Sequence, residues 1–347
     1  MNFEEKKEFI KNCIIFYRDR GYTLKGNINT LLKTGGLFST KTIWEETLKE
    51  IDSISASEVG AKIVDDVIAE FEKDLIKTIL FREKYLSIYI EPKNFDNIFL
   101  ALEKKYKKFN DNYHSIINSE MKFGFKKIQF DDLYFYISKD ISKLTSKIDL
   151  GLSALKDELK DSGYQKVFAF KEIEISSFNS IIVDKKNRNI ILSADLANHF
   201  QIDQLRQKIA GLVNLIRTET KLGHTIEDTG INLFPCIQKL YDEKHGFVKE
   251  LAFKTDEGVS HREIAKAGKD VREGEYHTAG SASTDIEPYD IKKSYGKKTE
   301  EDYKEVILKG SWYILSLPTP ILTNLTIHAN TLKSFNEILT KIIKLAI

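Results

Sequence analysis

Residues 167–195 read VFAFKEIEISSFNSIIVDKKNRNIILSAD, and this stretch decides the fold. Apolar and polar residues alternate over residues 167–175, and two apolar runs, residues 179–184 and 189–195, follow directly. Such runs predict consecutive β-strands. The polar residues 184–189 between the last two runs have the composition of a hairpin turn. Strands that follow one another through short turns, without intervening helices, favour an antiparallel sheet.

The residues before this stretch have a mainly helical pattern. Amphipathic periodicity predicts helices over residues 3–20, 40–54, 58–79 and 94–109, with a short strand over residues 86–90. Residues 123–140 carry strand-like aromatic residues, and helical character returns up to residue 160. The polar residues 161–163 indicate a break. We therefore expect an α+β protein, with a mainly helical domain over residues 1–162 and an antiparallel α+β domain over residues 163–347.

The residues after this stretch continue in the α+β pattern. They predict a helix over residues 202–217, a hairpin of residues 247–255 with 259–264, and strands over residues 312–317 and 321–327. A terminal helix from about residue 330 carries a wide apolar face. That face is a candidate contact with a protein partner or a second copy of the chain, and docking on the chain's own core is the alternative.

Composition narrows the class of protein. The chain has 347 residues, of which 41% are hydrophobic and 30% charged, and its net charge is +1. It is therefore an ordinary globular chain without a global field that would recruit nucleic acid or membrane. Cys13 and Cys236 are isolated, as is typical of reduced thiols in a cytoplasmic protein. No apolar run approaches the length of a membrane span, so no membrane partner is expected.

Residues 261–290, HREIAKAGKDVREGEYHTAGSASTDIEPYD, form a long polar run. The pattern predicts a polar connection, which is typical of functional loops and of disordered ones. A solvated loop whose charges only keep the chain soluble is the alternative. His261 and Glu263 would share one face of a strand, and Glu275 and His277 have the same spacing. As a metal-dependent phosphodiester hydrolase, the chain would use His261, Glu263 and His277 as metal ligands. Its catalytic groups would be Glu263, Asp270, Glu275 and Arg272, with Arg272 holding an oxyanion.

Two short segments interleave lysine with tyrosine. They are KKYKK at residues 104–108 and KKSYGKK at residues 292–298. Lysines can follow a nucleic-acid backbone, and Tyr106 or Tyr295 could stack on a base. The second segment is the preferred candidate because it follows the polar run. The predicted nucleic-acid-binding residues are Lys292, Lys293, Tyr295, Lys297, Lys298 and Arg272.

The segment from Arg217 to His224 resembles the Arg-x(4–6)-His pattern of HEPN ribonucleases, in which a dimer pairs two such sets over the scissile phosphate. The resemblance covers eight residues. Gly223 departs from it, because the family pattern places both residues on one helix. An arginine and a histidine near the end of a helix are also expected from the helix dipole alone.

Two classes of function remain open. The first is a non-enzymatic binding or adaptor protein of a prokaryotic cell, associated with nucleic acid and belonging to a phage-defence or mobile-element system. The second is the metal-dependent nuclease described above. The chain contains no phosphate-binding glycine loop or recognised metal motif. The first class therefore needs no cofactor, and the second needs a divalent metal.

Overall fold

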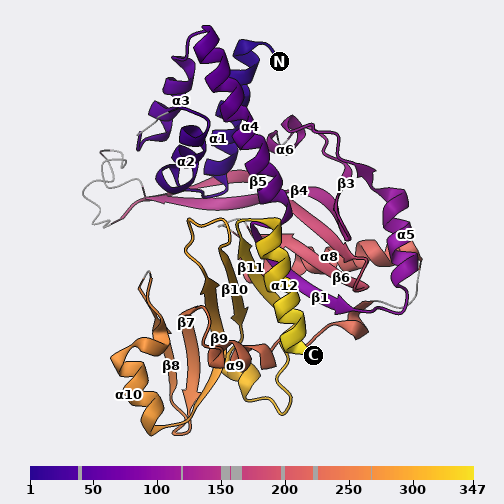
Figure 1. Ribbon diagram of the computed structural model, residues 1–347, viewed down its shortest axis with the longest axis vertical. Helices are drawn as coiled ribbons and strands as arrows, with labels where there is room; N and C mark the ends of the chain where they lie inside the picture. Colours follow the sequence, from indigo (N-terminus) through magenta and orange to yellow (C-terminus); the bar gives the residue numbers. More distant parts are fainter. Residues whose placement is uncertain are drawn as a thin grey trace.

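An antiparallel β-sheet runs through most of the molecule (Figure 1). In this computed structural model, residues 1–37, 41–118, 120–149, 157, 166–196, 200–221, 226–266 and 268–347 are described. Within them, 11 strands form one sheet in the order β2-β3-β4-β5-β6-β1-β11-β10-β9-β7-β8. Neighbouring strands are antiparallel except for β2 and β3, which run parallel. The expected α+β class is confirmed.

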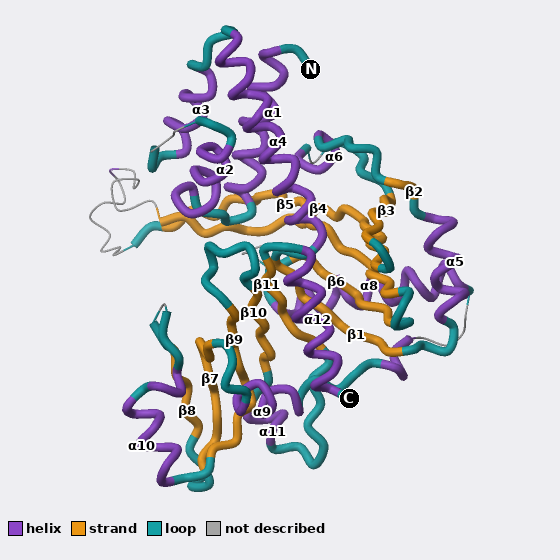
Figure 2. The backbone as a smooth tube through the Cα atoms, in the orientation of Figure 1, coloured by secondary structure: helices purple, strands orange, loops and turns teal. Residues whose placement is uncertain are grey.

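The described strands are β1 (Glu83–Ile90), β2 (Lys107–Lys108), β3 (Phe125–Phe130), β4 (Leu133–Asp149), β5 (Phe168–Asp184), β6 (Asn189–Asp195), β7 (Phe247–Thr255), β8 (Ser260–Ile264), β9 (Ile286–Tyr295), β10 (Lys304–Lys309) and β11 (Asn324–Ala329). The described α-helices (Figure 2) are α1 (Phe3–Asp19), α2 (Asn29–Thr34), α3 (Trp44–Asp52), α4 (Glu58–Leu80), α5 (Phe95–Lys105), α6 (His114–Ile117), α8 (Ile202–Thr220), α9 (Pro235–Asp242), α10 (Glu275–Ser283), α11 (Trp312–Leu315) and α12 (Leu332–Ala346).

The stretch that decides the fold forms the hairpin of β5 and β6. Asp184 pairs with Asn189 at its end, and the Asp184 side chain accepts a hydrogen bond from the Asn187 amide within the turn. Arg188 takes the left-handed conformation that such a turn requires, with φ of 56°. On its other edge, β5 pairs with β4 from Leu133↔Asp184 to Asp149↔Phe168. The predicted hairpin is confirmed.

Each face of the sheet carries a separate apolar core. On β1, Tyr85 and Tyr89 face the core beneath α5 and α8, whereas Leu86 and Ile88 face the opposite core. The helices α1, α4, α9 and α12 pack on that opposite face. Successive strand residues point to opposite faces, so a strand covered on both sides is buried throughout, as β6 is.

A buried ionic cluster joins α1 to the sheet. Asp195, at the end of β6, lies 2.9 Å from both the Lys84 ammonium and the Arg20 guanidinium, and each of the three side chains is at most 2% exposed. Burial alone would raise the pKa of Asp195, but the charges of Arg20 and Lys84 hold it below its ordinary value. Arg20 also donates to the Ser176 carbonyl on β5. Removing one member of such a buried group costs about 3–5 kcal/mol.

Several expected elements differ from those observed. Residues 312–317, expected as a strand, begin with helix α11, because the Ser311 hydroxyl caps the Ile314 amide. Residues 141–149, expected as helix, continue strand β4, and most of residues 150–160 lie outside the described part. The boundary at residues 162 and 163 also lies outside it and stays a prediction; β4 and β5 pair on either side of it.

The terminal helix α12 uses its apolar face within the chain. Phe335, Ile338, Leu339 and Ile342 are buried against β10, β11 and α9. Docking on the chain's own core therefore accounts for this face, and a contact of α12 with a partner or a second copy stays a prediction. Among the described helices, none is long and apolar enough to cross a membrane.

Candidate functional site

The polar run at residues 261–290 is largely regular structure. It contains β8, a 3₁₀ turn at Val271–Glu273, helix α10 and the first half of β9. The prediction that residues 261–290 form a polar connection is therefore wrong. Glu275 and His277 do not share one face, as they would on a strand, because they lie on helix α10. Residues two apart on a helix point in nearly opposite directions, so Glu275 is exposed and His277 is buried.

The three candidate metal ligands of the run, His261, Glu263 and His277, line one pocket of about 320 Å³ between α10 and the sheet. We call it the α10 pocket; its walls include Phe253, His261 and Glu263 from the sheet and Tyr276, His277 and Gly280 from α10. His261 and Glu263 share a face of β8, opposite Phe253 and Leu251 of β7. Strand alternation thus correctly predicted that His261 and Glu263 lie on one face. His277 reaches the same pocket from α10, which the sequence pattern did not predict.

His277 lies in a chain of hydrogen bonds. Its Nδ1 is 2.8 Å from Glu263 Oε2, and its Nε2 is 3.0 Å from the Tyr241 hydroxyl at the end of α9. With Glu263 ionised, the Nδ1–H donates to the carboxylate and Nε2 accepts from the tyrosine. The Phe253 ring packs edge-on against the His277 ring. These contacts hold α10 against the sheet.

The residues of the nuclease hypothesis do not assemble a metal centre. Among the described residues, no group of three or more His, Cys, Asp or Glu side chains is arranged to hold a metal ion. Asp270 is held away from the pocket by Arg272 and by the Val248 amide. Burial opposes ionisation of Asp270, but these hydrogen bonds lower its pKa overall. The geometry gives this hypothesis no support.

Arg272 is fully engaged inside the protein. Its Nη1 donates to the carbonyls of Tyr241 and Glu243, and its Nη2 to the Gly246 carbonyl, at 2.6–2.9 Å. Nε and Nη2 also donate to the Asp270 carboxylate. All five N–H donors of the guanidinium therefore have partners. Arg272 donates to carbonyls at the end of α9, where the last carbonyls of a helix have no N–H partner within the helix. The helix dipole also favours a positive charge at this end.

Lys293, like Arg272, donates hydrogen bonds to carbonyl groups at the end of α9. Its side chain is 0% exposed, and its ammonium donates to the carbonyls of Leu240 and Glu243 at 2.7 and 2.6 Å. Tyr295 is buried beside it and donates its hydroxyl to Glu243. Strand alternation in β9 turns these two side chains toward α9. In this conformation, neither meets a partner at the surface.

The other lysines of residues 292–298 stand beside carboxylates. Lys292 lies between Glu250 and Glu305, at 3.9 and 3.5 Å. Lys297 is exposed and 4.0 Å from Glu300, and Lys298 is exposed next to it. Their contact with nucleic acid stays a prediction, but the fold does not gather this segment into a basic patch.

The first lysine segment has a different environment. Lys104 lies in the last turn of α5, and Lys107 and Lys108 form the edge strand β2. All three are exposed, and none makes an ion pair among the described residues. We call these three lysines the β2 edge. Tyr106 between them is buried at 3% exposure, so the stacking role predicted for it does not fit.

Phe125 of β3 is an exposed aromatic residue that lies beside this edge. Its ring is 39% exposed and packs edge-on against Tyr106, and the Lys105 ammonium lies 4.4 Å from its centre. Lys105 in turn pairs with Glu219 near the end of α8. The pairing of Lys107 with Lys126 sets β2 directly beside β3. The β2 edge, Phe125 and α8 are therefore neighbours.

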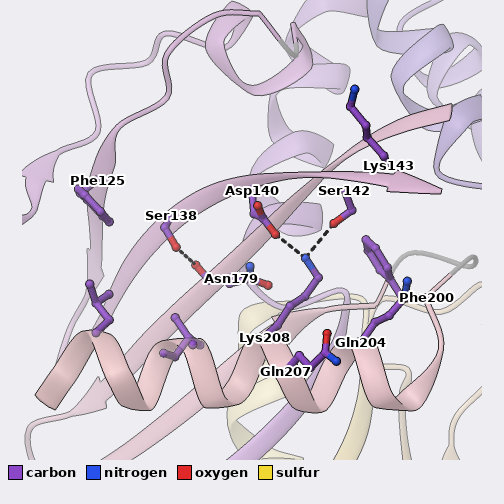
Figure 3. Close-up of a pocket in the computed structure, with 13 residues that line it drawn as sticks. Phe125, Ser138, Asp140, Ser142, Lys143, Asn179, Phe200, Gln204, Gln207 and Lys208 are labelled. Carbon is purple, nitrogen blue, oxygen red and sulfur yellow. Dashed lines mark hydrogen bonds and ion pairs between the residues drawn. The ribbon is translucent and has the colours of Figure 1, made fainter. Parts of the chain in front are cut away.

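Phe125 also lines a groove of about 580 Å³ between α8 and the β3–β4–β5 part of the sheet (Figure 3). We call it the α8 groove. Figure 3 shows Phe125 toward one end and Phe200 toward the other. Between them lie hydroxyl, amide and charged groups, including Ser138, Ser142, Asn179, Gln204, Gln207, Asp140, Lys143 and Lys208.

Lys208 fixes the floor of this groove. Its ammonium donates to Asp140 at 2.7 Å, to the Ser142 hydroxyl at 3.0 Å and to the Ser177 hydroxyl at 2.9 Å. It also lies 4.8 Å from the centre of the Phe200 ring. The neighbouring Lys143 is largely exposed and lies 3.5 Å from the Glu174 carboxylate. The groove therefore combines held polar groups with a cation that is open to solvent.

Sequence reasoning found the lysines of the β2 edge but not the groove. The groove residues come from three strands, helix α8 and Phe200 before it. Local spacing relates the residues within α8 and within β4, but it does not relate one element to another. For the Arg217–His224 pattern, Arg217 lies in the last turn of α8, whereas His224 lies outside the described residues. Comparison with protein-family models, curated proteins and solved structures found no match to this chain.

Proposed function

We propose that this chain is a cytoplasmic, non-enzymatic protein that binds single-stranded nucleic acid along the α8 groove and the β2 edge. The observation that carries the proposal is the position of Phe125. It joins a polar groove with a second aromatic side chain, Phe200, to three exposed lysines that have no carboxylate partner in the part of the chain that the structure describes. Proteins that bind single strands combine these same two elements, an aromatic surface for bases and a basic track for phosphates.

Each part of the surface has a separate task. Phe125 and Phe200 offer faces on which bases stack, a contact that every base can make. The exposed Gln207 amide offers a donor and an acceptor to base edges. The Gln204 amide offers a donor, because its Oε1 already accepts from the Gln201 amide. Lys143 and the β2 edge neutralise phosphates, which supplies a salt-dependent part of the affinity. A duplex would not present its bases to the two rings, so single strands are the favoured ligand.

The test measures the anisotropy of fluorescent oligothymidylate and oligouridylate, with a duplex of the same length as comparison. We expect the protein to bind at least one of the single strands and to bind the duplex more weakly. Raising the salt concentration should weaken the binding along a linear log–log plot. Absence of binding to both single strands at low salt would contradict the proposal.

Gly211→Leu tests whether the groove is the site. Gly211 lies in the middle of α8, lines the groove and has open space where a side chain would begin. Leucine should fill the groove while favouring the helix by about 0.5–1 kcal/mol. We expect binding to fall at least tenfold without loss of thermal stability. Gly280→Leu on α10 is the matched control, because Gly280 has the same open space but lies outside the groove.

A further inference from the structure

The α10 pocket is a second site that shares no lining residue with the α8 groove. Its carboxylates are Glu257 and Glu263, and no lysine or arginine stands among the described residues that line it. The nearest arginine on β8, Arg262, points to the opposite face and pairs with Glu250. The local field in the pocket is therefore negative, although the whole chain has a net charge of only +1.

One carboxylate oxygen in this pocket lacks a partner. Glu263 Oε2 is paired with His277 Nδ1, but Glu263 Oε1 is buried and has no hydrogen-bond partner among the described residues. Buried polar atoms in native proteins are nearly always paired. An ionised carboxylate has only acceptor sites, so the missing partner must be a donor.

The rest of the lining suits a small organic group. The rings of Phe253 and His261 lie nearly parallel, with centres 5.3 Å apart, and Tyr276 is an exposed ring on α10. The hydroxyls of Ser281, Ser283 and Thr284 complete the side formed by the end of α10. Aromatic faces beside a carboxylate favour cations.

We propose that the α10 pocket binds a small organic cation, with an N–H group of the ligand donating to Glu263 Oε1. The ligand class is an amidinium or ammonium compound with a compact apolar body. The contact between Glu263 and His277 positions the carboxylate for it. The stacked rings of Phe253 and His261 together form one wall of the pocket, against which the apolar body packs.

Three probes of closely similar shape test this proposal by isothermal titration calorimetry with the full chain. Benzamidine and benzylamine carry a positive charge at neutral pH, whereas benzamide is a neutral analogue of benzamidine. We expect at least one of the two cations to bind at least tenfold more tightly than benzamide. If neither cation exceeds benzamide, the proposal is wrong.

Two variants locate the binding. Glu263→Gln removes the charge while keeping the size of the side chain, and Gly280→Leu fills the pocket without touching Glu263 or His277. Each should weaken binding of the cation at least tenfold. The helical Gly280 has open space around it, so Gly280→Leu should fold even if Glu263→Gln does not. Gly211→Leu is the control and should bind the cation as the unaltered protein does.

Unchanged binding in Gly280→Leu would place the cation elsewhere and overturn the proposal. Binding that survives in Glu263→Gln, when this variant is shown to be folded by circular dichroism, would also overturn it. The test of the cation site is independent of nucleic-acid binding. Gly280→Leu should weaken cation binding and leave oligonucleotide binding unchanged, whereas Gly211→Leu should do the reverse.

Discussion

The two lysine–tyrosine segments, residues 104–108 and 292–298, are similar in sequence and opposite in structure. In the first, three lysines lie exposed at the edge of the sheet, and no described carboxylate pairs with them. In the second, Lys293 is fully buried against the end of α9, and Lys292 stands between two glutamates. The tyrosine is buried in both.

The difference follows from the position of each segment in the sheet. β2 is an outermost strand of only two residues, so one side of it has no neighbouring strand. β9 lies between β7 and β10 and beneath α9, so every second side chain must enter a packed layer. A lysine in that layer is tolerated only because carbonyl groups at the end of α9 accept its hydrogen bonds and the Glu243 carboxylate pairs with its charge. Lysine density alone therefore does not identify a binding surface.

The largest expected effect is on stability. Lys293→Ala should lower the free energy of unfolding by about 2–4 kcal/mol, because it leaves the Leu240 and Glu243 carbonyls without their cation. Lys108→Ala should change it by no more than about 0.5 kcal/mol. Urea unfolding measures both. Lys293→Met is the control for packing, and a small loss in Lys293→Ala would show that this lysine does not stabilise α9.

The next effect is on binding. Replacing Lys104, Lys107 and Lys108 together by Glu should weaken single-strand binding on the order of 100-fold at low salt. It should also reduce the slope of the log–log salt plot by about 2, as expected for three lost phosphate contacts. Lys297→Glu with Lys298→Glu is the matched control and should have little effect. The reverse pattern in the anisotropy assay would return the binding site to residues 292–298.

A smaller effect is expected from the aromatic residues. Phe125→Ala should weaken oligothymidylate binding about tenfold through lost base stacking. Tyr295→Phe should leave binding unchanged while lowering stability by about 1 kcal/mol, because it removes only the hydrogen bond to Glu243. Anisotropy and thermal unfolding of the same two variants separate these roles. Equal binding by Phe125→Ala and the unaltered protein would remove Phe125 from the interface.

The smallest effect is a dependence on pH at the buried segment. Burial opposes ionisation of Glu243, but Lys341, Tyr295 and Lys293 lower its pKa overall. A depressed carboxyl pKa gives stability that is present above the ordinary pKa of about 4.3 and lost as the pH falls through the lower folded value. Glu243→Gln should therefore be less stable than the unaltered protein at neutral pH. The gap in melting temperature should close below about pH 4; a gap independent of pH would show that the charge of Glu243 is not the cause.

The fold was more predictable from sequence than the candidate sites. Alternation and turn composition placed the β5–β6 and β7–β8 hairpins, and helical periodicity placed α4, α8 and α12. These are local properties of consecutive residues. Trp312 and Tyr313 were misassigned because aromatic content indicates a strand, whereas the Ser311 cap begins a helix. The pairing of His261 with Glu263 was predictable, but the arrival of His277 from α10 was not.

The sequence by itself determined the α+β class, the antiparallel hairpins and the lysines that are candidates for phosphate contact. Only the tertiary structure decided which of those lysines are exposed and that Lys293 and Arg272 serve the end of α9. It also decided that Phe125 and Phe200 share a groove. The physical reason is distance along the chain. Periodicity and capping act over a few consecutive residues. Whether a charged side chain is buried in an ion pair or exposed at the surface depends on residues that are distant in sequence and that the fold places beside it.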